Sequence, residues 1–275
     1  MSYCVGFIGA GNMATALAGG LLAHNFSPER LAMSDPRPQA LEEHAAKGIF
    51  TTHDNIELVR RSDVVVLAVK PQVVTEVLIP LRAIWQERQP LLLSIAAGIT
   101  LSGLQNLLGG HLAMVRAMPN TPALVQCGAS GYFCSDAVQE AQRRQAHEIL
   151  AAVGVALRVE QEELMDAVTA LSGSGPAYCF LVMEAMQAEG MALGLDERTA
   201  RALTLQTALG AAQMAVTSAV GVDELRRRVT SPGGTTEAAL AVMNGKGLKD
   251  IFAQAMQAAC SRATELGEML QGSQV

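Results

Sequence analysis

The sequence predicts an α/β protein, with an N-terminal Rossmann-type doubly wound parallel sheet followed by an all-helical domain. Up to about residue 160, short aliphatic runs alternate with helical patterns, as expected for buried parallel strands connected by helices. Beyond that point, long alanine-rich stretches are broken only at short turns that contain glycine or proline. We therefore expect two domains, residues 1–160 and residues 161–275, with the boundary near the charged sequence EQEE.

Six apolar runs are expected to be strands, because strands buried on both faces form continuous rather than alternating apolar runs. In chain order they are YCVGFIG, RLAMSD, DVVVLAV, PLLLSIAAG, LAMVRAMP and GVALRVE. The helical patterns between them supply the crossover connections that parallel strands need. In the second domain, the uncharged residues 203–222 are expected to form a helix buried against protein, because their threonines, serines and glutamines make them too polar to span a membrane.

The composition excludes several classes of protein. Half of the 275 residues are apolar and only 17% are charged, which is enough apolar material for two cores. A net charge of -6 argues against a nucleic-acid partner. The five cysteines form neither a CxxC pair nor a metal-ligand spacing, and the N-terminal residues lack a signal-peptide pattern. We expect a cytoplasmic protein that acts on a small molecule, without a metal, a membrane or a nucleic acid.

A glycine-rich loop directly follows the first expected strand. In GFIGAGNMA, the spacing of Gly9, Gly11 and Ala14 is that of the dinucleotide fingerprint, with alanine in the third small position. The first glycine makes the tight turn, the second lets a pyrophosphate approach the backbone, and the alanine packs the helix on the strand. The anion is expected on the N–H groups at the positive end of the helix. The loop therefore predicts a bound nucleotide cofactor.

The end of the second expected strand, SDPRP, concerns the choice between two nicotinamide cofactors. Asp35 stands where an acidic residue hydrogen-bonds the ribose hydroxyls of NADH, whereas Ser34 and Arg37 can hold the 2′-phosphate of NADPH. We expect NADPH because Arg37 can neutralise the phosphate. NADH remains an alternative because Asp35 repels the phosphate. A third interpretation treats Asp35 and Pro36 only as the start of a turn.

Histidine and lysine, the usual bases of hydroxy-acid dehydrogenases, are missing from most of the second domain. All five histidines lie in the first domain, and residues 162–245 contain neither histidine nor lysine. Dehydrogenases of hydroxy acids need such a base for the alcohol proton. Lys70, at the end of an expected strand, can face the cofactor, but it can equally contact a phosphate or close the loop. A substrate that carries its own proton, such as an iminium ion, needs no side-chain base, which favours reduction of a C=N bond.

A second candidate anion loop, TSPGGTTEA, covers residues 230–238. Gly233 and Gly234 remove side chains that would obstruct backbone donors, and the serine and threonines around them add hydroxyls. The simpler interpretation is a helix start, with Ser231 as the N-cap and Pro232 at the first helical position. The two interpretations are compatible, because a helix N-terminus is itself an anion site.

Six successive motifs resemble those of bacterial pyrroline-5-carboxylate reductases, the enzymes that make L-proline. In order they are GFIGAGNMA, VVLAVKPQ, SIAAGI, RAMPNTPA, DAVTALSGSGPAY and RRRVTSPGGTTEAAL. They extend over nearly the whole chain, and the last two are highly specific. The resemblance implies a Rossmann domain, a helical dimerisation and substrate-binding domain that interlocks with its counterpart in a homodimer or higher homo-oligomer, and NADPH or NADH as the reductant.

The resemblance also implies which residues form the sites. Cofactor contacts are expected from Gly9, Gly11, Asn12, Met13, Ser34, Arg37, Asn55, Ala68, Lys70, Pro71, Ala96, Ala97 and Asn120. Substrate contacts are expected from Thr169, Ser174, Pro176, Ser231, Gly233, Gly234, Thr235 and Thr236. In this family the loop that matches residues 230–238 binds the substrate carboxylate. Thr236 would lie near the ring nitrogen and is the candidate catalytic residue.

The expected reaction is transfer of a hydride from NAD(P)H to L-1-pyrroline-5-carboxylate, a cyclic imine, which gives L-proline in the last step of proline biosynthesis. Two alternatives remain. A related two-domain reductase or dehydrogenase would act on another cyclic imine or on a hydroxy acid, and the latter predicts a lysine or histidine in the cleft. A non-enzymatic nicotinamide sensor or assembly partner would have no need of a second anion loop.

Overall fold

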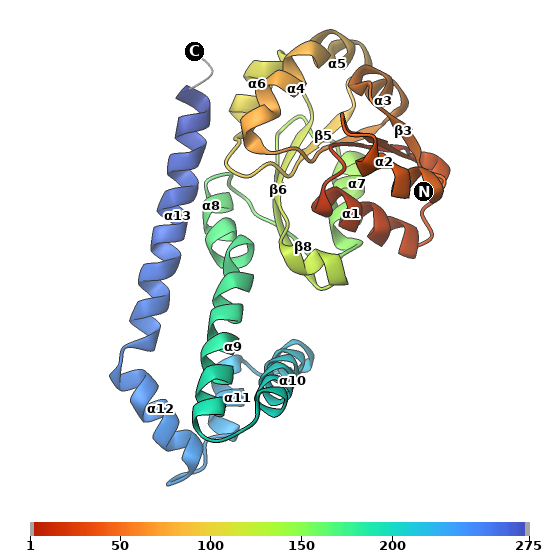
Figure 1. Ribbon diagram of the computed structural model, residues 1–275. Coiled ribbons are helices and arrows are strands. Elements are labelled where there is room, and N and C mark those ends of the chain that lie inside the picture. The colour runs from red at the N-terminus through yellow and green to blue at the C-terminus, as the bar shows by residue number, and fades with distance from the viewer. Residues whose placement is uncertain (1–2, 273–275) are drawn as a thin grey trace. The chain divides into compact units, whose positions relative to one another are not determined.

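The computed structural model describes residues 3–272 and contains an eight-stranded sheet with the strand order β3-β2-β1-β4-β5-β6-β7-β8 (Figure 1). The strands are β1 Val5–Ile8, β2 Leu31–Ser34, β3 Phe50–Thr52, β4 Val64–Leu67, β5 Leu91–Ser94, β6 Met114–Met118, β7 Gly128–Cys134 and β8 Gly154–Arg158. All neighbouring strands are parallel except β6 and β7, which are antiparallel. The predicted Rossmann-type α/β class is confirmed.

The six expected strands correspond to β1, β2, β4, β5, β6 and β8, whereas β3 and β7 were not predicted. Strand β3 has only three residues, two of them threonines, which is too short for a periodic signal. Strand β7 reads GASGYFC, in which two glycines and a serine interrupt the aliphatic run that predicts a buried strand. At Gly131 a Cβ would lie 2.5 Å from a methyl of Val168, so a close approach of another segment requires glycine there.

Helices cover both faces of the sheet and bury two separate cores. The helices are α1 Asn12–Ala23, α2 Gln39–Ala46, α3 Asn55–Arg61, α4 Val74–Leu78, α5 Arg82–Arg88, α6 Leu101–Leu108 and α7 Glu140–Ala151. Short 3-10 turns are found at Pro28–Arg30, Pro71–Val73, Ile79–Leu81 and Thr121–Val125. Along β4, Val64 and Val66 join the core shared with α1, α2 and α7, while Val65 and Leu67 join the core shared with α3 to α6. This alternation explains why the strand is apolar throughout.

The remaining elements are helical, as predicted. They are α8 Leu164–Val168, a π-helical turn Thr169–Gly173, α9 Gly175–Ala192, α10 Glu197–Thr217, α11 Val222–Arg228, α12 Thr235–Gly245 and α13 Leu248–Gly272. The expectation of one helix over residues 203–222 is wrong at its C-terminal end. The helix ends at Thr217, Ser218 has an extended backbone, and its hydroxyl accepts a hydrogen bond from Val220 N. This local bond competes with a continued helix.

The chain forms two compact units that differ in extent from the predicted domains. Residues 3–174 belong with residues 258–272, and Gly175–Gln257 form the second unit. Helix α13 therefore begins in the second unit and ends in the first. Within residues 3–272, no helix is long and apolar enough to cross a membrane.

Candidate cofactor and substrate sites

The glycine loop after β1 has the shape that a pyrophosphate needs. Gly9 has a φ of +99°, and a Cβ there would lie 2.7 Å from the carbonyl oxygen of Ala68. Gly11 is the N-cap of α1, and no atom lies within 4 Å of the position its Cβ would occupy. No side chain caps this helix end and its first turn contains no acidic residue. The backbone amides of Asn12 and Met13 are therefore available to an anion in open space beside Gly11.

Asp35, at the end of β2, accepts four hydrogen bonds and is nearly fully buried. Its Oδ2 accepts from Ala10 N at 3.0 Å, and the Arg37 guanidinium binds both carboxylate oxygens, at 2.9 and 3.1 Å. Arg37 N donates the fourth bond, at 3.0 Å. A carboxylate has about four lone-pair positions, and all of them are therefore used inside the protein. Burial alone would raise the pKa of Asp35, but the bonds from Arg37 and Ala10 outweigh it and lower the pKa to about 2.

This arrangement changes the interpretation of Asp35. A carboxylate whose lone pairs are occupied cannot accept two ribose hydroxyls without releasing Arg37. The side chain instead joins the glycine loop to the end of β2 and fixes the guanidinium of Arg37, which is two-thirds exposed. Two of the five guanidinium N–H groups bind Asp35, so three remain for a phosphate.

Ser34 and Asn55 form a second polar pair next to Asp35. The Ser34 hydroxyl donates to Asn55 Oδ1 at 2.6 Å, and Ser34 is buried. His53 Nδ1 lies 2.8 Å from the carbonyl oxygen of Asp35. The fold thus brings together three of the predicted residues, Ser34, Arg37 and Asn55, at the carboxyl end of β2, where open parallel sheets bind ligands.

The predicted nicotinamide-side residues follow β4, β5 and β6. Strands β1 and β4 are neighbours although β2, β3 and the helices α1 to α3 lie between them in the chain, and Ala68 N donates to Ile8 O at 2.9 Å. This is the topological switch point, where doubly wound sheets hold their ligands. Pro71 begins the 3-10 turn after β4 and Lys70 is exposed before it. After β5, Ala96 is buried and Ala97 is exposed.

Asn120, after β6, is used to hold other segments in place. Its Oδ1 accepts from Ala129 N at 2.9 Å, and its Nδ2 donates to the carbonyl oxygen of Ser172 at 3.1 Å. The Ser172 hydroxyl donates to the carbonyl oxygen of Ala129 at 2.8 Å, which closes the network. Ser172 lies in the π-helical turn, where Ser174 N bonds Thr169 O at 2.8 Å. Such turns are frequent at functional sites.

The predicted substrate residues before α9 lie in and after this turn. The Thr169 hydroxyl donates to the carbonyl oxygen of Met165 at 2.9 Å, one turn earlier. Ser174 is the residue at which the chain leaves the first unit, and Pro176 lies in the first turn of α9 in the second. Whether these side chains contact a substrate remains a prediction.

The second candidate anion loop lies at the start of α12. Gly233 has a φ of +71°, and no atom lies within 4 Å of its Cβ position. The alternative with Ser231 as N-cap is wrong, because the helix begins at Thr235 with Gly234 as its N-cap. Residues 231–234 instead form a turn, in which Gly234 N donates to Ser231 O at 3.0 Å. No side chain caps α12, so its first amides remain available to an anion.

Glu237, in the first turn of α12, is a further residue of this loop that the motifs do not indicate. Its Oε2 accepts from Gly233 N at 2.7 Å, so a carboxylate of the protein occupies one amide of the loop. The sequence signal is the TTEA segment, in which an acidic residue in the first helical turn can reach back to a preceding N–H. The Glu237 carboxylate therefore holds the turn at Gly233 and places a negative charge beside its amide.

Comparison with known proteins assigns the chain to a family. A family model for pyrroline-5-carboxylate reductase dimerisation matches residues 162–266, and one described as NADP oxidoreductase coenzyme F420-dependent matches residues 4–98. The pyrroline-5-carboxylate reductase of Pseudomonas aeruginosa is 49% identical over 97% of this chain and 97% of its own length. That of Vibrio alginolyticus is 46% identical over 96% of this chain and 98% of its own.

This chain belongs to the pyrroline-5-carboxylate reductase family. Among solved structures, a pyrroline-5-carboxylate reductase from Coxiella burnetii has a TM-score of 0.94 at 42% identity, covering 97% of this chain and 99% of the other. A pyrroline carboxylate reductase from Plasmodium falciparum, solved with NADP bound, has a TM-score of 0.84 at 30% identity, covering 97% and 98%. The family predicted from the motifs is confirmed.

Proposed function

We propose that this protein reduces L-1-pyrroline-5-carboxylate to L-proline with NADPH as the hydride donor, NADH being the alternative donor. The observation that carries the proposal is a pair of glycine loops in one chain of this family. The loop after β1 is open beside an uncapped helix of 12 residues, as a pyrophosphate requires. The loop at residues 231–236 is open beside the uncapped start of α12, as a carboxylate requires.

The residues after β1 and β2 are suited to hold NADPH, which supplies the hydride when bound. The amides of Asn12 and Met13 would bind the pyrophosphate, because the positive end of α1 lies there. Arg37 would bind the 2′-phosphate with the N–H groups that Asp35 does not use. Because Asp35 holds the guanidinium in one geometry, little side-chain freedom is lost when a phosphate binds. This supports NADPH over NADH.

The residues of the second loop are suited to a small carboxylate. Gly233 has no side chain over its backbone, and the first amides of α12 are not capped. Ser231 and Thr235 are exposed and can donate hydroxyl protons. Thr236 is half-buried, and we propose that its hydroxyl binds the ring nitrogen and orients the imine carbon. Glu237 must release the N–H of Gly233 before that amide can bind the substrate.

Reduction of a protonated imine needs orientation more than acid-base chemistry. The iminium ion already carries the proton that the amine product keeps, so no side chain has to supply a base. Holding two reacting atoms in contact can be equivalent to about 10⁵ to 10⁸ M. The absence of histidine from residues 162–245 suits this reaction and does not suit oxidation of a hydroxy acid.

We propose that the second unit forms a homodimer, or a larger assembly built from dimers. In the single chain, α9 buries none of its residues, and Phe180, Leu181 and Leu209 are each more than 60% exposed. Exposed apolar residues also occur along α10, where Leu203, Met214 and Val216 lie open to solvent. Soluble monomers rarely leave so much apolar surface open. Light scattering should give the mass of a dimer or a multiple of it, and a monomer would contradict the proposal.

We propose a cytoplasmic location and no partner other than the substrate, the cofactor and copies of the same chain. The five cysteines are free thiols, which suits a reducing compartment. The net charge of -6 opposes binding to nucleic acid. Fractionation of cells that produce the native protein, with detection in the soluble and membrane fractions, tests the location.

The deciding experiment is oxidation of NADPH with three substrates in parallel. Pyrroline-5-carboxylate should be reduced with a higher kcat/KM than a six-membered cyclic imine carboxylate, and the keto form of a hydroxy acid should not be reduced. Preference for the six-membered imine would assign the protein to another cyclic-imine reductase. Binding of NADPH without turnover of any imine would support a nicotinamide sensor and refute the proposal.

A further inference from the structure

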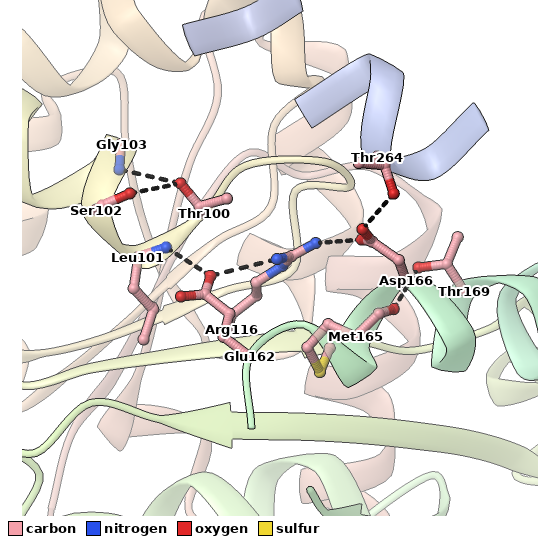
Figure 2. A network of polar contacts seen from close by, with 10 residues as sticks. All are labelled: Thr100, Leu101, Ser102, Gly103, Arg116, Glu162, Met165, Asp166, Thr169 and Thr264. Atoms are coloured by element: carbon pink, nitrogen blue, oxygen red, sulfur yellow. Dashed lines mark hydrogen bonds and ion pairs between the residues drawn. The ribbon is translucent and has the colours of Figure 1, made fainter. Parts of the chain in front are cut away.

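A buried ion network joins four segments of the first unit that lie far apart in the chain (Figure 2). Arg116, on β6, is 6% exposed and donates to Glu162 Oε1 at 3.2 Å and to Asp166 Oδ1 at 3.1 Å. Glu162 Oε1 also accepts from Leu101 N, at the start of α6, at 2.8 Å. Thr264, on α13, donates to Asp166 Oδ2 at 2.9 Å. Arg116 interrupts the apolar run LAMVRAMP, and a buried guanidinium needs such partners.

A second contact joins the end of α13 to the loop after β5. Gly98 has a φ of +77°, and a Cβ there would lie 3.5 Å from Gly267 N. A Cβ on Gly267 would lie 3.0 Å from the carbonyl oxygen of Gly98. The helix and the loop thus approach each other through two glycines. Gly267 is buried and lies just beyond the residues 162–266 that the dimerisation family model matches.

The segments that α13 contacts are those that carry predicted site residues. The loop after β5 contains Ala96 and Ala97 and leads to Thr100, the N-cap of α6. Asp166 lies in α8, which continues directly into the π-helical turn from Thr169. Arg116 pairs in register with Ser94, the last residue of β5. A displacement of α13 would therefore move the cofactor loop and the π-helical turn together.

We propose that residues 258–268 of α13 form a positioning element of the cofactor site, in which Gly267 fixes the loop at Gly98 and Thr264 fixes α8 through Asp166. The proposal rests on the proposed function, since the loop after β5 is assigned to the nicotinamide half. Gly267 and Thr264 contact no reacting group and act through the residues that they hold. The Thr264 hydroxyl also lies 3.3 Å from Cys260 O in its own helix, so its bond to Asp166 is the shorter of two.

Two variants separate positioning from folding stability. Gly267→Ala introduces a Cβ against the Gly98 carbonyl, while alanine is the better helix former. We therefore expect an unchanged or higher Tm together with a dissociation constant for NADPH at least about threefold higher, a change that a purely structural role would not produce. Thr264→Val keeps the shape and removes the donor, and should weaken NADPH binding in the same direction. Thr264→Ser should restore the wild-type value.

The matched control is Gly19→Ala, in the middle of α1, where no atom lies within 4 Å of the new Cβ. It should bind NADPH as the wild type does. NADPH binding is measured by fluorescence titration of the full chain without an imine, and turnover of pyrroline-5-carboxylate is measured separately. Wild-type dissociation constants for both Gly267→Ala and Thr264→Val would overturn the positioning role, whatever their Tm. Failure of the wild type to reduce the imine, with NADPH binding intact, would refute only the proposed function.

Discussion

Replacing Arg37 by alanine tests how the end of β2 selects its cofactor. In the structure Arg37 is held by both oxygens of Asp35, and three of its guanidinium N–H groups remain available. The substitution removes the positive charge and also frees the carboxylate of Asp35. The 2′-phosphate of NADPH would then meet a buried negative charge instead of a cation. The ribose of NADH carries two hydroxyls there, and a free carboxylate can accept both.

The expected size of the effect follows from the contacts. The substitution removes a charge-assisted hydrogen bond to the phosphate, and solvent weakens this bond because the Arg37 side chain is 67% exposed. Repulsion between the freed carboxylate and the phosphate adds up to about 1 kcal/mol across a solvated gap of about 4 Å. Together these predict a loss of at least about tenfold in kcat/KM for NADPH. The kcat/KM for NADH should stay constant or rise.

The assay compares initial rates with both cofactors at saturating imine. The wild-type advantage of NADPH should also fall as ionic strength rises, because the phosphate contact is partly solvated. Arg88→Ala is the control, since it removes one positive charge at the exposed end of α5. Equal losses for NADPH and NADH in Arg37→Ala would show that the substitution damages the fold of the site and would refute selection by the phosphate.

Three further predictions concern the carboxylates of Asp35 and Glu237 and the hydroxyl of Thr236. The pKa of Asp35 is lowered from 3.8 to about 2, so its bonds stabilise the fold above pH 4 by about 2 kcal/mol, and this contribution is lost as the pH falls from about 4 to about 2. In urea unfolding, the difference in free energy of unfolding between the wild type and Arg37→Ala should decrease as the pH falls over that interval. A difference that does not change with pH would contradict the prediction. Thr236→Ala should lower kcat/KM for the imine at least about tenfold, which corresponds to about 1.4 kcal/mol. Thr236→Ser, which keeps the hydroxyl, is the control. An unchanged kcat/KM for Thr236→Ala would remove Thr236 from the mechanism. Glu237→Gln keeps an acceptor for Gly233 N without the charge and should lower the KM for the imine about twofold or more, whereas a raised KM would mean that the charge helps binding.

The class of fold and the family could be predicted from local sequence patterns, because continuous apolar runs and glycine motifs are local properties. Strand β7 could not be, because its pairing with β6 and β8 depends on residues distant in the chain and its glycines serve close packing. The end of α10 at Thr217 depends on one side-chain bond of Ser218. Patterns of apolar residues carry no information about such a bond.

The candidate site could be predicted as a set of residues but not as a set of contacts. The family resemblance assigned Ser34, Arg37 and Asn55 to the cofactor, and Ser34 and Arg37 were also expected there because they lie at the end of the second predicted strand. The sequence left the role of Asp35 open between a ribose ligand and a turn, because residue type does not tell which lone pairs are occupied. The polar network of Asn120 depends on a π-helical turn more than 40 residues later in the chain. Only the folded chain brings these groups together.

Asp35 and Glu237 show why those contacts decide function. Each is an acidic residue beside a predicted anion site. From the sequence alone, each carboxylate would be expected to repel the bound anion. Asp35 is paired with Arg37, so its charge organises a cation for the phosphate. Glu237 accepts an amide of the loop, and within residues 3–272 no salt bridge neutralises it. Removing the charge should therefore act in opposite directions. Asp35→Asn should weaken NADPH binding by releasing Arg37, whereas Glu237→Gln should strengthen substrate binding. The dissociation constant for NADPH is measured with the first variant and that for proline with the second, and a change in the same direction for both would contradict this argument.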